Sequence, residues 1–306
     1  MPGKSWRACS GMSGPTDMPN ADPLCDVDVA ALLALGPRAG RLPHVAPEMA
    51  RRPGVIATRP RGQGHEIREV RPFTDGDDLR HLDAAATART GILQVRSFHE
   101  DRDRTVMLIA DFRRPMLWGT QRFRSVAAAE ALAVAGWQAV TDGGTVGVAV
   151  LTDVGIFSEK PASRSQGMAR AAGCLARGHL VALQSVRPSV RPPVRDLDAD
   201  LIRAARLAPR GATIVLASAL DQPGPGFEAA LGAIVRHGAL LLFLMQDPFE
   251  LTPPRGSLPY RTASGLAARG AFASLPALRA ALVARLVQIG VRVERIATDR
   301  SVLEMA

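Results

Sequence analysis

The sequence predicts a doubly wound α/β fold with a mainly parallel sheet, preceded by an irregular region that contains short strands. Four apolar runs do not alternate with polar residues, which is typical of parallel strands buried on both faces. These runs are TVMLIAD (105–111), TVGVAVL (145–151), TIVLASAL (213–220) and ALLLFLM (239–245). Helical patterns lie between the runs, and the connections are short. Strand–helix alternation of this kind favours right-handed crossovers within one sheet.

The N-terminal third has weaker patterns than the rest of the chain. Residues 1–25 are small, polar and rich in proline and glycine, which predicts a disordered tail. VDVAALLAL (27–35) predicts one short helix, and five prolines between residues 36 and 64 predict irregular chain. Two alternating segments then predict strands on either side of a helical turn or two: EIREVRPF (66–73), ILQVRSF (92–98) and, between them, LRHLDAAATAR (79–89).

The remaining helices are predicted from apolar residues at three- and four-residue spacing. Their expected ranges are 122–141, about 164–177, 198–208, 226–237 and 275–290, and the last leads into the strand VRVERIA (291–297). Gly143, Gly144 and Gly238 stand where helices should end. We therefore expect three parts: a tail (1–25), an N-terminal region (26–103) and an α/β domain (104–306).

Composition and charge favour a cytoplasmic protein that does not bind nucleic acid. The formal net charge is +9, but the arginines are spread along the chain, and residues 59–104 balance nine arginines with nine acidic residues. Aromatic residues make up 4% of the chain, too few for a base-stacking platform. The start of the chain lacks the apolar core of a secretory signal, and no stretch approaches the ~20 apolar residues of a membrane span. Three distant cysteines predict neither disulfides nor a zinc site.

The segment FTDGDDLRHLD (73–83) places four aspartates around one glycine. A calcium loop counted from Asp75 would need a glutamate where Ala86 stands, and a catalytic carboxylate pair would need a cleft. We interpret the segment as a lattice of arginine–carboxylate pairs, because such pairs are planar and directional enough to fix an irregular region. A partner-facing surface is the alternative. The lattice residues are Glu66, Arg71, Gly76, Asp77, Asp78, Arg80, Asp83, Arg89 and Arg96.

Five of these residues have more specific expected roles. Gly76 would permit a positive φ in the turn. Asp77 or Asp78 would cap the short helix that follows, and Arg89 and Arg96 would reach back to these carboxylates.

Asp111 ends the first predicted parallel strand and opens the loop DFRRPM (111–116). Ligands of open parallel sheets bind beyond the carboxyl ends of the strands, so this carboxylate is a candidate metal or phosphate site. Arg113 and Arg114 would repel a divalent cation, and Pro115 offers neither a hydroxyl nor an N–H. The loop therefore predicts a structural turn or a contact with an anion or a partner's carboxylate, made by Asp111, Arg113 and Arg114.

The motifs of residues 62–116 resemble the conserved block of a bacterial family known as domain of unknown function fifty-eight. They include G-D-D-x-R-x-x-D at 76–83, T-A-R at 87–89 and the strand that ends in Asp111. QDPFE (246–250) is similar to a later D-P-x-E segment of the family. The resemblance extends over roughly residues 30–300. It implies a von Willebrand factor A-like domain, which has a Rossmann-type fold, preceded by the signature region.

Domains of that type often hold a divalent ion through a D-x-S-x-S motif, the metal-ion-dependent adhesion site. In this chain Arg113 and Pro115 replace the two serines, and Ala219 stands where the family usually has an aspartate after a middle strand. The resemblance therefore predicts a degenerate site at Asp111, Arg113, Pro115 and Ala219, with no metal and no other cofactor.

Members of this family are commonly encoded near MoxR-type AAA+ ATPases. The resemblance therefore implies a non-enzymatic protein-interaction module that works with such an ATPase in maturing or assembling other proteins. Two alternatives stay open: a magnesium-dependent adhesion-type binding module and a hydrolase of unknown substrate.

Overall fold

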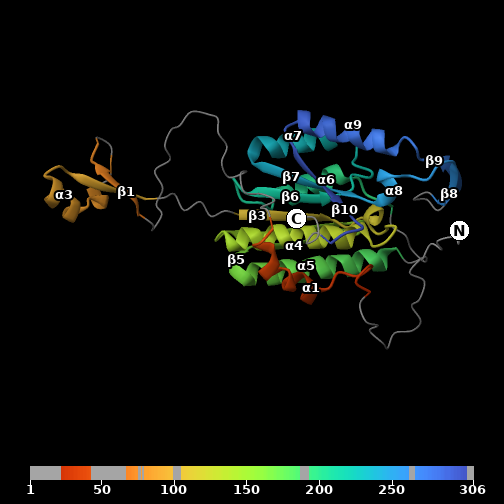
Figure 1. Cartoon of the computed structure of the whole chain (residues 1–306), viewed down its shortest axis with the longest axis horizontal. Coiled ribbons are helices and arrows are strands. Elements are labelled where there is room, and N and C mark those ends of the chain that lie inside the picture. Colours follow the sequence, from red (N-terminus) through yellow and green to blue (C-terminus); the bar gives the residue numbers. More distant parts are fainter. Residues whose placement is uncertain are drawn as a thin grey trace. The chain divides into compact units, whose positions relative to one another are not determined.

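The computed structural model describes residues 22–42, 67–74, 77, 79–98, 105–186, 193–261 and 266–301. The chain divides into two units, a smaller one within residues 51–103 and a larger one formed by residues 1–50 and 104–306 (Figure 1). Most of the predicted tail and of the proline-rich segment 36–64 lies outside the described residues.

The smaller unit is built from two antiparallel strands and one helix. Strand β1 (Ile67–Pro72) pairs with β2 (Gln94–Phe98), and the 3-10 turn η1 (Leu79–His81) and helix α3 (Ala84–Thr90) lie between them in sequence. Helix α3 begins at Asp83, whose side chain accepts a hydrogen bond from the Ala86 N–H at 2.9 Å. It ends at Gly91, with φ of 72°, a left-handed conformation that glycine adopts without strain. The predicted strand–helix–strand order is confirmed.

The larger unit contains a six-stranded sheet in the order β10-β7-β6-β3-β4-β5, and every neighbouring pair except β4–β5 is parallel. Its strands are β3 (Thr105–Asp111), β4 (Thr145–Thr152), β5 (Gly155–Ser163), β6 (Thr213–Ser218), β7 (Ala239–Gln246) and β10 (Arg292–Ala297). The four predicted apolar runs form β3, β4, β6 and β7. They are continuous in apolar residues because helices cover both faces of the sheet.

Two layers of helices enclose the sheet (Figure 1). One layer contains α1 (Val29–Ala34), α2 (Gly36–Ala39), α4 (Arg124–Thr141) and α5 (Arg164–Ser185). The opposite layer contains α6 (Leu197–Ala205), α7 (Phe227–His237) and α9 (Leu275–Gln288). The doubly wound architecture predicted from the sequence is confirmed. None of the helices in the described ranges is both long and apolar enough to cross a membrane.

Several boundaries and elements differ from the expectation. Helices α1 and α2 pack on α4 and α5 through apolar side chains such as Leu32 and Leu33, so they belong to the larger unit and not with residues up to 103. Strand β5 was not predicted, because it is a half-exposed edge strand that contains Lys160 and Pro161. The hairpin of β8 (Ser257–Arg261) and β9 (Ala267–Ala271) was also missed, since it lacks an apolar run.

The order of the strands places a switch point between β3 and β6. From β3 the chain continues through α4 on one face of the sheet to β4, whereas from β6 it continues through α7 on the other face to β7. The connections that leave these adjacent strands therefore diverge. In an open α/β sheet this is the place where a ligand-binding crevice forms.

Candidate functional site

Asp111 and Ser218 are the last residues of β3 and β6, and they meet at the switch point. The Ser218 hydroxyl donates to Asp111 Oδ2 at 2.7 Å and accepts a hydrogen bond from the Leu220 N–H at 2.9 Å. Asp111 is 1% exposed and Ser218 is 0% exposed. A carboxylate buried this deeply must have its charge balanced and its oxygens hydrogen-bonded.

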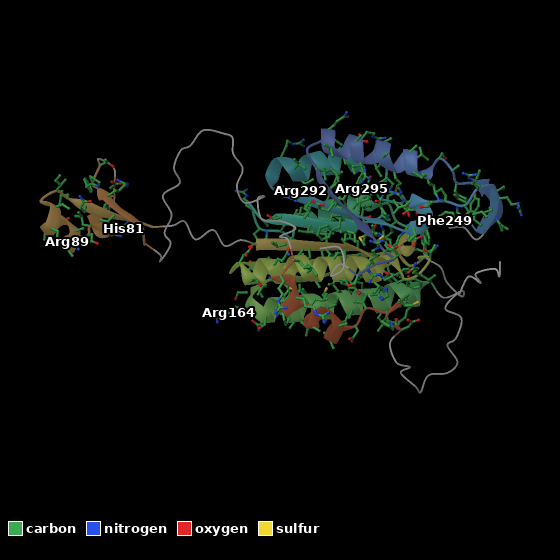
Figure 2. All side chains as sticks on the ribbon, in the orientation of Figure 1. His81, Arg89, Arg164, Phe249, Arg292 and Arg295 are labelled. Atoms are coloured by element: carbon green, nitrogen blue, oxygen red, sulfur yellow. The ribbon has the colours of Figure 1, made fainter. Side chains whose placement is uncertain are left out.

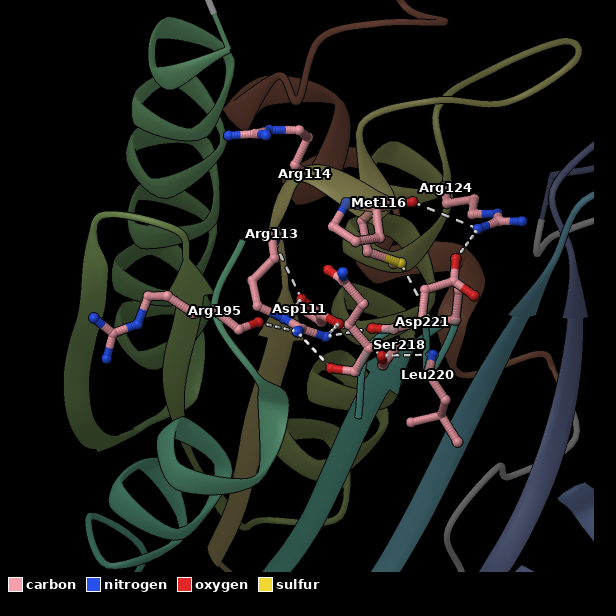
Figure 3. A network of polar contacts seen from close by, with 12 residues as sticks. Asp111, Arg113, Arg114, Met116, Arg124, Arg195, Ser218, Leu220 and Asp221 are labelled. Atoms are coloured by element: carbon pink, nitrogen blue, oxygen red, sulfur yellow. Dashed lines mark hydrogen bonds and ion pairs between the residues drawn. The ribbon is translucent and has the colours of Figure 1, made fainter. Parts of the chain in front are cut away.

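Arg113 balances that charge by folding back onto the carboxylate two residues before it (Figure 3). Its Nε donates to Asp111 Oδ1 at 2.9 Å, and its Nη2 donates to Asp111 Oδ2 at 2.8 Å. The Arg113 backbone N–H donates to Oδ1 as well, at 3.1 Å. This is a bidentate guanidinium–carboxylate pair in which the arginine is 0% exposed.

The other N–H groups of Arg113 bind main-chain carbonyls that surround the crevice. Nη1 donates to the carbonyls of Arg195 at 2.6 Å and Gln222 at 3.0 Å, and Nη2 also donates to that of Asp221 at 3.1 Å. All five guanidinium donors therefore have partners. Burial is the largest single influence and opposes the charged form, but the carboxylates of Asp111, Asp153 and Asp200 together raise the pKa of the Arg113 guanidinium.

These contacts leave no room for a metal ion on Asp111. Its two oxygens accept four hydrogen bonds, which is about the full capacity of a carboxylate. The cation that a metal site would hold is replaced by a covalently attached guanidinium. The residues at this site therefore do not fit a divalent ion. Within the described ranges, no three His, Cys, Asp or Glu side chains gather in a cluster suited to a metal.

The predicted docking role of Asp111 and Arg113 needs correction, because both side chains are buried and neither reaches a surface. Arg114 is only half-buried, and its backbone N–H donates to Asp153 at 2.8 Å. Pro115 lies in the 3-10 turn η2 (Arg114–Met116). Ala219, at the other strand end, is fully buried.

The loop after β6 has an unusual backbone where it meets Arg113. Leu220 and Gln222 have φ of 56° and 51°, a left-handed conformation that costs a non-glycine residue of the order of 1 kcal/mol or more. The carbonyls of Asp221 and Gln222 from this loop bind the guanidinium. The buried cation therefore helps to hold a strained loop in place.

A ring of alternating charges lies beside the crevice. Arg124, at the start of α4 and 0% exposed, pairs with Asp221 at 2.7 Å and with Glu250 at 2.8 Å. Arg279 of α9 pairs with the same two carboxylates and donates to the Ala219 carbonyl at 2.6 Å. The Arg124 guanidinium also lies over the Trp118 ring, 3.9 Å from its centroid. We call Arg124, Asp221, Glu250 and Arg279 the charge ring.

The D-P-x-E segment supplies one member of the charge ring. Asp247 and Glu250 form a capping box at the start of α8 (Pro248–Leu251), in which Glu250 also accepts the Asp247 N–H. Asp247 is buried and accepts hydrogen bonds from the Thr120 N–H at 2.8 Å and from its hydroxyl. Sequence reasoning noted this segment but assigned it no role, and it missed Arg124, Asp221 and Arg279. The sequence contains one sign of the buried Arg124: it is an arginine in the first turn of an apolar, alanine-rich helix.

In the smaller unit, part of the predicted lattice is present. Arg71 forms a bidentate pair with Asp77, both contacts at 2.8 Å, and this pairing holds the pKa of the Asp77 carboxyl well below its usual range. Asp83, rather than Asp77, caps the helix that follows. Arg80 and Arg89 are exposed (Figure 2 labels Arg89).

The remaining lattice residues are only partly covered by the structure. Glu66, Gly76 and Asp78 lie outside the described residues, and of Arg96 only the backbone in β2 is described.

A buried Ser–His pair, Ser125 and His179, predicts a pH dependence. His179 is 2% exposed, its Nε2 is 2.9 Å from the Ser125 hydroxyl, and burial lowers its pKa to about 4. The unfolded chain therefore binds a proton that the folded chain excludes between pH ~6.5 and ~4. The neutral His179 therefore contributes to the stability of the folded state. This stabilisation is complete above pH ~6.5 and is lost as the pH falls towards ~4, where the free energy of unfolding is lower by about 3 kcal/mol.

His179→Gln keeps a hydrogen-bonding side chain but does not titrate. We expect its unfolding free energy to fall less steeply than that of the wild type between pH 7 and 4.5, as measured by urea denaturation. Parallel curves for the two proteins would contradict the buried neutral imidazole.

Comparisons with known proteins identify the family of this chain. A family model described as "Protein of unknown function DUF58" matches residues 69–262, more than half of the chain. Two solved structures are similar, each over 63% of this chain and 90% of its own: the conserved hypothetical protein BatB from Bacteroides thetaiotaomicron (14% identity, TM-score 0.43) and an aerotolerance-related membrane protein from Bacteroides fragilis carrying multiple mutations to serines (18% identity, TM-score 0.38). A search of the curated proteins finds no match. The resemblance seen in the signature motifs is therefore confirmed, and the chain belongs to the DUF58 family.

Proposed function

We propose that this protein is a non-enzymatic interaction module whose strand-end crevice is permanently closed by its own Arg113. The observation that carries the proposal is the saturation of this crevice. Five guanidinium donors and four carboxylate acceptor positions are all used inside the protein. The place where an open α/β sheet ordinarily binds a ligand is thus filled by a side chain.

The buried carboxylates of the larger unit support a structural role over a catalytic one. Asp111, Asp200 and Glu250 each form an ion pair with at least one arginine. A general acid or base needs a carboxyl group that can change its protonation state next to a substrate. In these pairs the guanidinium groups occupy the carboxylate oxygens, which are therefore not presented to a substrate. A hydrolase is therefore the less favoured alternative.

The larger unit is best interpreted as a von Willebrand factor A-like domain with a degenerate metal site. This interpretation is supported by the position of Asp111 at the end of a central strand and by the arginine and proline in place of two serines. The partner we propose, from the family resemblance, is a MoxR-type AAA+ ATPase in the cytoplasm. The protein would bind it, or a client of it, during maturation or assembly of other proteins.

Two measurements on the purified protein test this proposal. Size-exclusion chromatography with the MoxR-type ATPase of the same cell should give a shared peak at micromolar concentrations, and separate peaks would reject the partner. Calorimetric titration with Mg²⁺ or Mn²⁺ in the absence of nucleotide should give no saturable heat. A one-to-one binding curve would instead favour the magnesium-dependent adhesion-type module.

A further inference from the structure

A partly exposed aromatic cluster lies at the end of the larger unit that carries α8 and the β8–β9 hairpin (Figure 1). Phe272 forms edge contacts with Phe249 and Tyr260, with ring centroids 5.2 Å and 5.5 Å apart. Phe249 is labelled in Figure 2. Tyr260, the only tyrosine of the chain, is 42% exposed, and Leu251 beside the cluster is 45% exposed. Aromatic residues are scarce in this protein, so their gathering at one partly exposed place requires an explanation.

The same region has an unbalanced positive charge. From residue 251 to residue 293 the sequence contains six arginines and no acidic residue. Three of these arginines pair with carboxylates that lie outside this stretch of sequence. Arg279 pairs with Asp221, Arg285 with Glu228 and Arg292 with Glu294. Arg255 and Arg269 lie on or beside the hairpin and are exposed, and within the described residues no carboxylate pairs with either of them. Arg269 donates to the Ser257 carbonyl at 3.1 Å.

The hairpin itself is a two-stranded sheet with no further strand partner among the described residues. A two-stranded sheet is marginally stable in water unless other elements cover it. One contact that joins it to the rest of the larger unit is the packing of Tyr260 on Phe272. This is the arrangement expected of an element that gains stability when a partner covers it.

We propose that this hairpin surface, formed by Phe249, Leu251, Tyr260 and Phe272 with Arg255 and Arg269, is the docking surface for a protein partner that presents acidic residues around an apolar anchor. Tyrosine and arginine are the residue types that dominate binding energy in protein interfaces. The guanidinium groups suit carboxylates, with which they form bidentate pairs. The inference rests on the proposed interaction role and assigns the surface that performs it.

An anionic membrane is a poorer fit to the same surface. Electrostatic attraction to acidic lipids takes a cluster of roughly four to eight basic residues, each adding about 1 kcal/mol. The hairpin surface presents Arg255 and Arg269, and its aromatic rings are packed edge to face on one another rather than projecting along one side of a helix.

Site-specific photo-crosslinking of the full chain in its native cell tests the inference. A benzophenone amino acid would replace Tyr260 and, as a control on α5, Leu180, which is 56% exposed. We expect position 260 to crosslink to a different protein at a segment that contains Asp or Glu. The double variant Arg255→Glu/Arg269→Glu should reduce this crosslink about tenfold, because like charges then face each other. The double variant Arg206→Glu/Arg210→Glu, with the same change of charge at exposed positions away from the hairpin, should not.

The possible outcomes separate this inference from the proposed function. Protein crosslinks at position 180 but not at 260 would overturn the hairpin surface and leave an interaction role intact. An absence of protein crosslinks at both positions would overturn both. A crosslink to a second copy of the chain would overturn the proposal that the hairpin surface binds an acidic protein partner. A crosslink that is insensitive to charge reversal at 255 and 269 would overturn it as well. Sedimentation with phosphatidylglycerol vesicles, lost on the same charge reversal and without any protein crosslink, would overturn it in favour of lipid.

Discussion

Replacing Arg113 with methionine should lower the free energy of unfolding by about 3–5 kcal/mol, the usual cost of removing one partner from a buried ion pair. The Asp111 carboxylate, 1% exposed, would keep only the Ser218 hydroxyl and one backbone N–H as donors. The carbonyls of Arg195, Asp221 and Gln222 would lose the guanidinium as well. Urea denaturation followed by circular dichroism measures the change directly.

Two further variants make this prediction specific. Arg210→Met removes an exposed arginine and should change stability by no more than about 0.5 kcal/mol. The double variant Asp111→Asn/Arg113→Met removes both charges, so it should cost less than the sum of the two single changes. A loss below about 1 kcal/mol for Arg113→Met would mean that the crevice is hydrated and not closed by this arginine.

The location of the strand-end site at Asp111 was predictable from the sequence, but its closure by the inward-pointing Arg113 was not. A strand that ends in an aspartate marks the switch-point edge of a parallel sheet, and the sequence of the following loop predicted that a metal would be repelled. Whether Arg113 points outward or inward depends on carbonyls that lie 82 to 109 residues away in the sequence. Those acceptors come together only when the sheet has formed, so local sequence gives the charge of the side chain and not its direction.

The same distinction separates the elements that were predicted from those that were missed. Buried parallel strands leave a continuous apolar run, so β3, β4, β6 and β7 were recognised. Strand β5 and the β8–β9 hairpin are partly exposed and have no such run. In the smaller unit, the intermingled arginines and aspartates predicted guanidinium–carboxylate pairs without saying which residues pair, and Arg71–Asp77 is one such pair. The capping role of Asp83 was assigned to an earlier aspartate, since several candidates precede α3 and the sequence does not fix where the helix begins.

The charge ring provides the second large effect, through Glu250. Glu250→Gln should lower the free energy of unfolding by about 3 kcal/mol, because Arg124 and Arg279 would share the single carboxylate of Asp221. Glutamine keeps an oxygen that can accept the Asp247 N–H, so the cap at the start of α8 is preserved and the measured loss reports the charge.

Glu294→Gln is the matched control for this change, because it removes the same charge from an exposed pair with Arg292 at 3.0 Å. Exposed pairs contribute about 0–1 kcal/mol and are screened by salt, whereas a buried pair is screened much less. The Glu250→Gln loss should therefore persist in 0.5 M salt, while any loss from Glu294→Gln should shrink. Equal losses for the two variants would show that the ring is solvated, and the loop from Ala219 to Gln222 would then have to be held by Arg113 alone.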